Sequence, residues 1–357
     1  MASVIWDYIR EEQAVLQRIV ASNQTEIVAD ELAGKIKTIY FVGHGSSFNA
    51  AVSTLPYYNK VSGVRAYAYT PENLFTAGSA LLLEDKNSSL VVGISQTGTS
   101  AGAFNALHKA IEMGYKTLSL TAVGSSPIAS LSDYSLNLMC GEEDSNAKTK
   151  GYSATLTVLL LFAISLGKKT GFLAMGEHCQ FINEINGMIA SIPKVMYQVI
   201  EFGKKNRFGE GMKDLYVVTS GVHLGSAQEG QLKVMETMCI PTMCNDIGEF
   251  SHGMHRSINP GSSILLIRCP DGKESRIEQV ACYFANLKTS VWIIDCTGKP
   301  SGFPLCLSLP SFKRTQSLFL VVLALQILSV LAPEYNSLDP NRNSNDSFTI
   351  VDGTRIQ

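Results

Sequence analysis

The stretch "SSLVVGISQTGTSAGAFNALHKAIEMGYKTLSLTA", residues 88–122, carries the pattern that decides the fold. A short apolar run turns into a loop of Gly, Ser, Gln and Thr. The next segment places Phe104, Leu107 and Ile111 at helical spacing and ends at Gly114, before a second apolar run begins. Apolar runs of strand length that alternate with amphipathic helices indicate a parallel sheet covered by helices on both faces.

The same pattern occurs twice along the chain. "KTIYFVG" (37–43) and "DYSLNLMC" (133–140) are further strand-like runs in the first half. "DLYVVTSGVHLGSAQEG" (214–230), "GSSILLIRCPDGKE" (261–274) and "TSVWIIDCTGKP" (289–300) echo first-half segments at a nearly constant offset. Such self-similarity indicates a repeated unit. We expect an α/β protein of two tandem doubly wound parallel-sheet domains, each a flavodoxin-like three-layer αβα sandwich.

The repeat also predicts the domain boundaries. We expect a first domain with an N-terminal helix over 1–170, connecting helices over 171–208 and a second domain over 209–335. A helix over 313–332 would close the second domain. The polar tail, 336–357, lacks a core-forming pattern and is expected near the site.

Composition narrows the class of protein. Hydrophobic residues make up 45% of the chain and charged residues 17%, so a folded core is expected. The net charge is −2, so neither nucleic acid nor a membrane is expected as a partner. The eight cysteines form no C-x-x-C pair and predict reduced, mostly buried thiols in a cytoplasmic protein. The longest apolar stretch, 318–332, is too short to span a bilayer and predicts a buried helix. Acidic residues stand where a signal peptide needs an apolar run, so no secretion signal is expected.

Two loops rich in hydroxyl groups follow strands of the first domain. They are "GHGSSFNA" (43–50) and "SQTGTSAGA" (95–103), and both lead into helices. Helix N-termini and neutral hydroxyl donors can hold a phosphate without a lysine or arginine. The alternatives are that Ser and Thr only cap the helices and that His44 is an ordinary loop residue. Phe48 stands where a dinucleotide fingerprint needs its third glycine, so NAD is not expected; no metal-ligand spacing occurs either.

Candidate acid–base groups lie in the second domain. Glu229, Lys233 and Glu236 fall on one face of a predicted helix at positions i, i+4 and i+7. The alternative for this face is a solvated ion-pair stripe. An irregular segment at 245–261 then carries His252 and His255. A carboxylate and an imidazole that meet in a pocket can transfer protons near neutral pH.

These segments together resemble the sugar isomerase (SIS) domain family. "GHGSSFNA" resembles its first sugar-phosphate loop and "SQTGTSAGAFNAL" its SQSGET-type phosphate loop. "CGEEDSNAKTK" (140–150) and "EGQLKVMETMCIPTMCNDIGEFSHG" resemble segments of the isomerase part of glucosamine-6-phosphate synthase. The resemblance implies carbohydrate-derivative binding, no cofactor, and a homodimer or higher homo-oligomer with shared active sites. It implies catalytic Glu236 and His252, supporting Glu229, Lys233 and Ala147, and phosphate or sugar contacts from Gly45, Ser46, Ser47, Ser95, Gln96, Thr97 and Ser100.

Departures from the synthase refine the expected reaction. No glutaminase domain precedes the pair in this sequence, so glutamine-driven amination is not expected. Asp346 stands where the synthase tail has its Schiff-base lysine, and an aspartate cannot form an imine. Thr99 replaces the loop glutamate. A double SIS chain with the Glu and His but no tail lysine resembles the fructosamine-6-phosphate deglycases. These hydrolases cleave phosphorylated sugar–amino acid conjugates to glucose 6-phosphate and the free amino acid.

Two alternatives remain open at this stage. The first is an aldose–ketose phosphosugar isomerase or amino-sugar-phosphate deaminase that uses the same acid–base pair. The second is a sugar-phosphate sensor without turnover, although no helix-turn-helix arm or basic region is evident.

Overall fold

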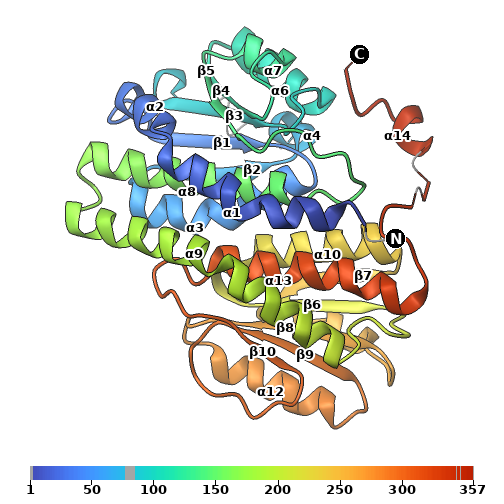
Figure 1. Ribbon diagram of the computed structural model, residues 1–357. Helices are drawn as coiled ribbons and strands as arrows, with labels where there is room; N and C mark the ends of the chain where they lie inside the picture. Colours follow the sequence, from blue (N-terminus) through green and yellow to red (C-terminus); the bar gives the residue numbers. More distant parts are fainter. Residues whose placement is uncertain (1–2, 77–84, 343, 346, 357) are drawn as a thin grey trace. The chain divides into compact units, whose positions relative to one another are not determined.

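The computed structural model describes residues 3–76, 85–342, 344–345 and 347–356, and it contains two parallel sheets. The first sheet has the order β2-β1-β3-β4-β5, every adjacent pair being parallel (Figure 1). Its strands are β1 (Thr38–Val42), β2 (Arg65–Tyr69), β3 (Ser89–Ile94), β4 (Lys116–Thr121) and β5 (Tyr134–Asn137). Both apolar runs of the opening stretch are strands, which confirms the predicted doubly wound, flavodoxin-like order.

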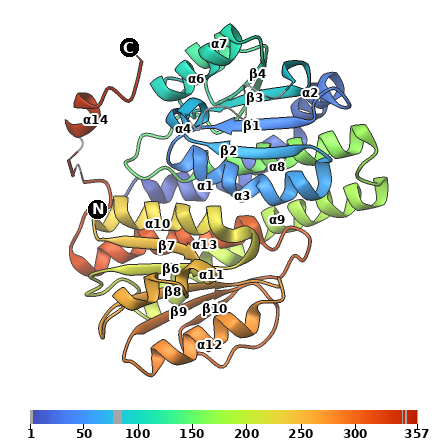
Figure 2. The same cartoon turned by 180° about the vertical axis from the view of Figure 1, so that it is seen from behind.

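Helices cover both faces of the first sheet, as Figure 2 shows for α6 and α7 on one side and α3 and α8 on the other. Tyr40, Val42 and Val91 of the sheet pack with Leu107 of α6 and Ile128 of α7 in one core cluster. The helices are α2 (Gln24–Leu32), α3 (Ser46–Tyr57), α4 (Pro71–Thr76), α6 (Ala101–Glu112), α7 (Pro127–Leu131) and α8 (Lys150–Thr170). Gly114, with φ of 83°, follows α6 as its pattern predicts.

The second sheet repeats the first. Its order is β10-β9-β8-β6-β7, the same topology read from the other edge. The strands are β6 (Leu215–Thr219), β7 (Thr242–Asp246), β8 (Ser263–Arg268), β9 (Ser290–Asp295) and β10 (Cys306–Ser308). Its helices are α10 (Leu224–Met238), α11 (Ile247–Phe250), α12 (Glu274–Ala285) and α13 (Leu318–Leu331). α13 begins at 318 rather than 313, because the preceding residues form turns and Gln316 and Ser317 have positive φ.

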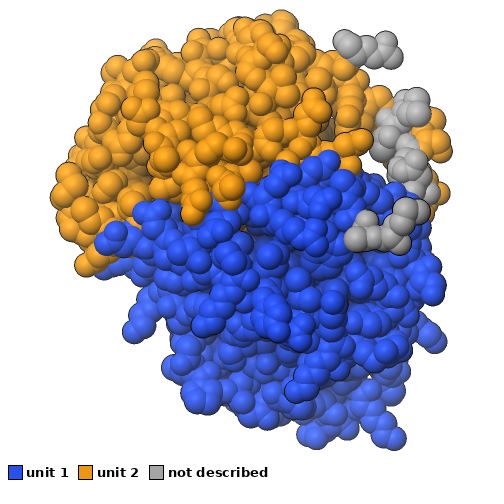
Figure 3. All heavy atoms as spheres, in the orientation of Figure 1, with its two compact units in different colours: residues 1–13, 145–149, 183–342 blue, residues 14–144, 150–182, 343–357 orange. Residues whose placement is uncertain are grey.

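The chain divides into two compact units, each holding one sheet (Figure 3). Unit 1 comprises residues 1–13, 145–149 and 183–342; unit 2 comprises 14–144, 150–182 and 343–357. Both α1 (Ile5–Ala21) and the long α9 (Met175–Lys205) are divided between the units. The remaining elements are α14 (Ser347–Val351), a π-helix at Tyr58–Ser62, and short 3₁₀-helices at Lys86–Ser88, Gly221–His223, Met254–Ser257 and Ala332–Asn336.

The burial of the side chains tests the expectations of a buried apolar helix and of mostly buried cysteines. Lys150–Thr170 and Leu318–Asn336 are long and apolar enough to cross a membrane by length and composition, but their apolar windows are 100% and 89% buried within the protein. Core helices pass the same test, and the predicted buried helix at 318–332 is observed. The prediction of mostly buried thiols is wrong: three of the eight cysteines are buried, while Cys179, Cys239 and Cys282 lie on exposed faces of helices or helix ends.

Candidate functional site

The first hydroxyl-rich loop leaves the end of β1 and starts helix α3. Gly45, with φ of 50°, is the N-cap, and Ser46 and Ser47 form the first turn. A Cβ on Gly43 would lie 2.8 Å from the Cβ of Ser47, so the loop needs a glycine there. Val42 is in register with Gly93 of β3, which brings this loop beside the one after β3. The strand order reverses between these two strands, and open α/β sheets bind ligands at such a point.

The second loop, after β3, is folded around the hydroxyl of Ser95. Ser95 is buried, and its Oγ accepts hydrogen bonds from the backbone N–H of Gly98 at 3.1 Å and of Ser100 at 3.4 Å. Gly98 has φ of 71°, and a Cβ there would lie 2.1 Å from the Oγ of Ser126. Ser95 therefore shapes the loop, and its burial leaves it little room for direct contact with a ligand.

The remaining residues of this loop include one that caps a helix and several with backbone N–H groups that could bind an anion. Ser100 caps α6 by accepting from the N–H of Ala103, and the hydroxyls of Thr97 and Thr99 lie 2.9 Å apart. The backbone N–H groups of Thr97, Thr99 and Gly102 have no hydrogen-bond partner among the described residues. Free N–H groups at a helix N-terminus favour an anion.

Gln96 is oriented by a carboxylate that the sequence did not reveal. Its Nε2 donates to Glu143 at 3.1 Å, and Glu143 also accepts from the N–H of Lys150 at 3.2 Å and of Gly151 at 3.0 Å. Glu143 thus satisfies the first turn of α8 and fixes the Gln96 amide. A Cβ on Gly151 would lie 2.2 Å from the Gln96 Oε1, so a larger residue there would displace the Gln96 amide from this position. The only signal in the sequence is an acidic residue ahead of a helix.

His44 is paired across the first loop. Its Nε2 lies 2.9 Å from a carboxylate oxygen of Glu72 in α4, and its ring lies against the first turn of α6, where a Cβ on Gly102 would approach its Cε1 to 2.5 Å. Burial raises the pKa of Glu72, but the hydrogen bond from His44 and other contacts outweigh it, so the pKa is lowered overall.

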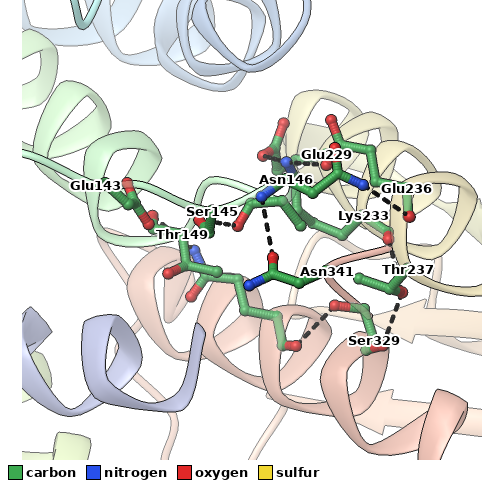
Figure 4. Close-up of polar contacts among 12 residues, drawn as sticks. Glu143, Ser145, Asn146, Thr149, Glu229, Lys233, Glu236, Thr237, Ser329 and Asn341 are labelled. Carbon is green, nitrogen blue, oxygen red and sulfur yellow. Dashed lines mark hydrogen bonds and ion pairs between the residues drawn. The ribbon is translucent and has the colours of Figure 1, made fainter. Parts of the chain in front are cut away.

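Helix α10 carries the acid–base candidates, and two of them are buried rather than on a solvated face. Glu229 and Lys233 are each 1% exposed, so the alternative of a solvated stripe is wrong. Lys233 Nζ lies 3.4 Å from Glu229 and donates to Glu236, whose side chain is 27% exposed (Figure 4). Burial raises the pKa of Glu236 above its usual value, although the Lys233 charge opposes the shift. A carboxyl group tuned in this way is suited to proton transfer.

Two asparagines hold the segment before α8 against α10. The Asn146 N–H donates to Asn341 Oδ1 at 3.0 Å, and Asn146 Nδ2 donates to the Glu236 carbonyl at 3.3 Å (Figure 4). Ala147, next in the chain, is fully buried. These residues position the backbone around Glu236. Sequence analysis did not identify Asn146 or Asn341, because nothing local marks a contact across so many residues.

His252 lies in an irregular segment after α11 and is exposed. Its backbone N–H donates to the Glu249 carbonyl at 3.0 Å, and its ring has no partner among the described residues. His255 instead bonds the Phe250 carbonyl through Nδ1 at 3.1 Å. No contact joins His252 to Glu236 in the described part of the chain. Asp346, the residue expected in place of the tail lysine, lies outside the described residues.

Residues 34–165 match the SIS domain family. A glutamine–fructose-6-phosphate aminotransferase (isomerizing) from Thermococcus kodakarensis is 27% identical over 271 residues, 74% of this chain and 44% of that protein. The chain spans about two fifths of the length of the curated relatives it matches.

Two solved structures share the fold over nearly the whole chain. One, assigned as a phosphosugar isomerase from Clostridium difficile 630, has a TM-score of 0.88 at 26% identity and covers 100% of this chain and 99% of its own. The other is the C-terminal domain of glucosamine-fructose-6-phosphate aminotransferase from Francisella tularensis, with a TM-score of 0.88 at 18% identity and coverage of 96% and 99%. The predicted SIS fold is confirmed.

Proposed function

We propose that this chain, whose residues 34–165 form a SIS domain and which is homologous to the isomerase domain of glucosamine-6-phosphate synthase, is a deglycase of 6-phosphorylated sugar–amino acid conjugates. It would hydrolyse a fructosamine 6-phosphate to glucose 6-phosphate and the free amino acid. The observation that carries the proposal is the half-buried carboxyl of Glu236 in contact with the buried ammonium of Lys233.

Glu236 is the proposed proton carrier. The ketoamine has its nitrogen on C1 and its carbonyl on C2. Removal of a C1 proton and protonation of the C2 oxygen give an enaminol, and return of a proton to C2 gives an imine between C1 and nitrogen. Water then adds to C1, and the carbinolamine releases the amine and the aldose. A group whose pKa is raised toward neutrality can both accept and return the proton. Lys233 would offset negative charge as Glu236 ionises.

The setting of Lys233 and the tail residue Asp346 support a substrate that brings its own nitrogen. Lys233 is 1% exposed and lies between two carboxylates, so its amine is engaged as a charge partner. Asp346 stands in the tail where the synthase has its lysine. Hydrolysis of an imine already formed from the substrate needs no enzyme-bound imine.

The two loops of unit 2 are the proposed phosphate site. Gly45, Ser46 and Ser47 begin α3, while Thr97 and Ser100 precede or cap α6. Ser95 and Gln96 would support the loop, since Ser95 Oγ and Gln96 Nε2 already bond to neighbouring groups. Neutral donors and helix N-termini would hold the phosphate.

His252 is the proposed second acid–base group, supplied by a neighbouring subunit. Its exposed ring and its lack of a partner among the described residues support contact with another copy of the chain. We propose that the protein is a homodimer whose two chains share active sites, and that it is cytoplasmic. Mixing an E236Q subunit with an H252N subunit tests the arrangement: a shared site regains activity in the mixed dimer, whereas sites complete within one chain stay inactive.

Incubation with fructoselysine 6-phosphate, glucoselysine 6-phosphate and conjugates of other amino acids tests the deglycase. Formation of glucose 6-phosphate together with an equal amount of amino acid is expected. If the folded protein releases neither from any conjugate, the deglycase assignment fails.

A second candidate is an aldose–ketose isomerase or amino-sugar-phosphate deaminase, and the similarity to a protein assigned as a phosphosugar isomerase favours it. Fructose, tagatose and galactosamine 6-phosphates separate these activities by product. Interconversion of free sugar phosphates identifies an isomerase, and release of ammonia identifies a deaminase. A sensor would change neither sugar nor amine.

A further inference from the structure

The end of the chain pairs with the second hydroxyl-rich loop. Ser100 and Arg355 form an isolated antiparallel bridge. The Ala101 N–H donates to the Thr354 carbonyl at 3.1 Å, and the Ile356 N–H donates to the Thr99 carbonyl at 3.0 Å. All these residues belong to unit 2. The last residues of the tail, after α14 (labelled in Figure 1), therefore pair with the N-terminus of α6.

The pattern of these bonds determines how the two side chains lie. The hydrogen bonds join the flanking residues rather than Ser100 and Arg355 themselves, which makes this a non-hydrogen-bonded pair. In such a pair the Cα atoms are about 4.5 Å apart and the side chains lie close together on one face. The Ser100 hydroxyl caps α6. The Arg355 side chain therefore leaves the backbone beside the helix N-terminus.

The Arg355 guanidinium supplies the positive charge that the two hydroxyl-rich loops lack. Segments 43–50 and 95–103 contain no lysine or arginine, and the imidazole of His44 is already paired with Glu72. Arg355 is exposed and has no carboxylate partner among the described residues. A guanidinium carries five donors in a planar fork and matches a phosphate with two parallel hydrogen bonds.

We propose that Arg355 binds the phosphate group of the sugar phosphate, as a residue delivered to the loop by the tail. This inference rests on the proposed function, because it takes the loop of Ser95 to Ser100 as the phosphate site. The Thr354 carbonyl occupies the Ala101 N–H, and the N–H groups of Thr97, Thr99 and Gly102 remain for the anion. Arg355 is a binding residue and takes no part in proton transfer.

Calorimetric titration with fructose 6-phosphate and with fructose tests the assignment. The variants are R355A, R355K, a chain truncated after Gly353, and D352A as a control in the same tail. Loss of a charged hydrogen-bond partner is expected to weaken fructose 6-phosphate binding about ten- to hundredfold in R355A and in the truncated chain. R355K keeps the charge but not the fork, so its affinity is expected to lie between those of R355A and the wild type. D352A is expected to bind as the wild type does.

The outcomes separate this inference from the function on which it rests. Unchanged affinity of R355A, or tighter binding after truncation, overturns the role of Arg355 while the phosphate site stands. Tighter binding would mean that the tail competes with the ligand. If the folded wild type binds no fructose 6-phosphate, the phosphate site itself fails and the role of Arg355 fails with it. Because Arg355 is exposed, its replacement leaves the core intact, which thermal unfolding of each variant verifies.

Discussion

Lys233 and Glu236 form an ion pair in which only the carboxylate reaches solvent. The lysine side chain is 1% exposed and the glutamate side chain 27%. The ammonium thus lies beneath the carboxyl group that it contacts, and Glu229 lies 3.4 Å from the same nitrogen. The carboxyl group of Glu236 is therefore the member of this pair that can exchange a proton with solvent or with a ligand.

Replacing Glu236 with Gln is expected to abolish proton transfer but not phosphate binding. The amide keeps the shape of the side chain and loses its titration, so kcat should fall about 10²–10⁴-fold, with fructose 6-phosphate affinity unchanged. Steady-state kinetics and calorimetry measure the two effects. E201Q, an exposed glutamate on α9, is the control. Turnover at the wild-type rate in E236Q would exclude this residue as the acid–base group.

Replacing Lys233 with Met is expected to move the acidic limb of the pH–activity profile to higher pH. Burial already raises the pKa of Glu236, and the Lys233 charge opposes that shift. Removing the charge raises the pKa further, so ionised Glu236 forms only at higher pH. The variant is also expected to lose about 3–5 kcal/mol of stability, because one partner of a buried pair is gone.

A charge-retaining variant and a surface control accompany this measurement. K233R keeps the cation and should leave the limb closer to that of the wild type, and K204M on α9 should not move it. An acidic limb at the wild-type position in folded K233M would contradict the electrostatic role of Lys233.

His223 is expected to make stability fall in acid. It is fully buried at the start of α10, its Nε2–H donates to the Gln316 carbonyl at 2.9 Å, and burial lowers its pKa to about 4. A histidine with a lowered folded pKa contributes stability that is present above its unfolded pKa, near 6.5, and is lost as pH falls toward 4. The loss integrates to about 3 kcal/mol.

Urea unfolding of wild type and H223Q between pH 7 and pH 4 measures this contribution. The difference in free energy of unfolding should shrink as pH falls, since glutamine does not titrate and the other groups are shared. A difference that stays constant over this range would show that His223 is not the titrating group.

Replacing Ser95 with Ala is expected to loosen the second loop. The N–H groups of Gly98 and Ser100 would lose their acceptor, at a cost of about 1–3 kcal/mol. Fructose 6-phosphate binding should weaken at least tenfold, because the loop loses its shape. S89A is a matched control: Ser89 is equally buried in β3, but its hydroxyl has no partner among the described residues. Equal affinities of S95A and S89A would contradict the role of Ser95 in shaping the site.

Apolar periodicity predicted the sheets because their central strands are buried on both faces. β1, β3, β6 and β8 are buried along their whole length, which requires continuous apolar or small residues. β7 was missed because it is an edge strand with the polar sequence "TMCND", of which only Thr242 is buried. Strands at sheet edges carry a weaker apolar signal.

The sequence named Glu229, Lys233 and Glu236 as candidates but did not predict the burial of the first two. The i, i+4 spacing of Glu229 and Lys233 is the same on a solvated and on a buried helix face, so burial cannot be derived from it. Glu143, Asn146 and Asn341 act through contacts with residues remote in sequence. The pairing of Ser100 with Arg355 is of the same kind, because a bridge of single residues leaves no periodic pattern.

The division of α1 between the units sets an order of events during synthesis. Residues 1–13 belong with the unit of the second sheet, and Gln13 Nε2 donates to the Ile189 carbonyl at 3.2 Å, 176 positions further along the chain. At roughly 5–20 residues per second, the first turns of α1 are made about 10 to 35 s before that partner. Ile5 and Ile9 of α1, fully buried in the folded protein, thus precede most of the unit to which they belong by the same interval.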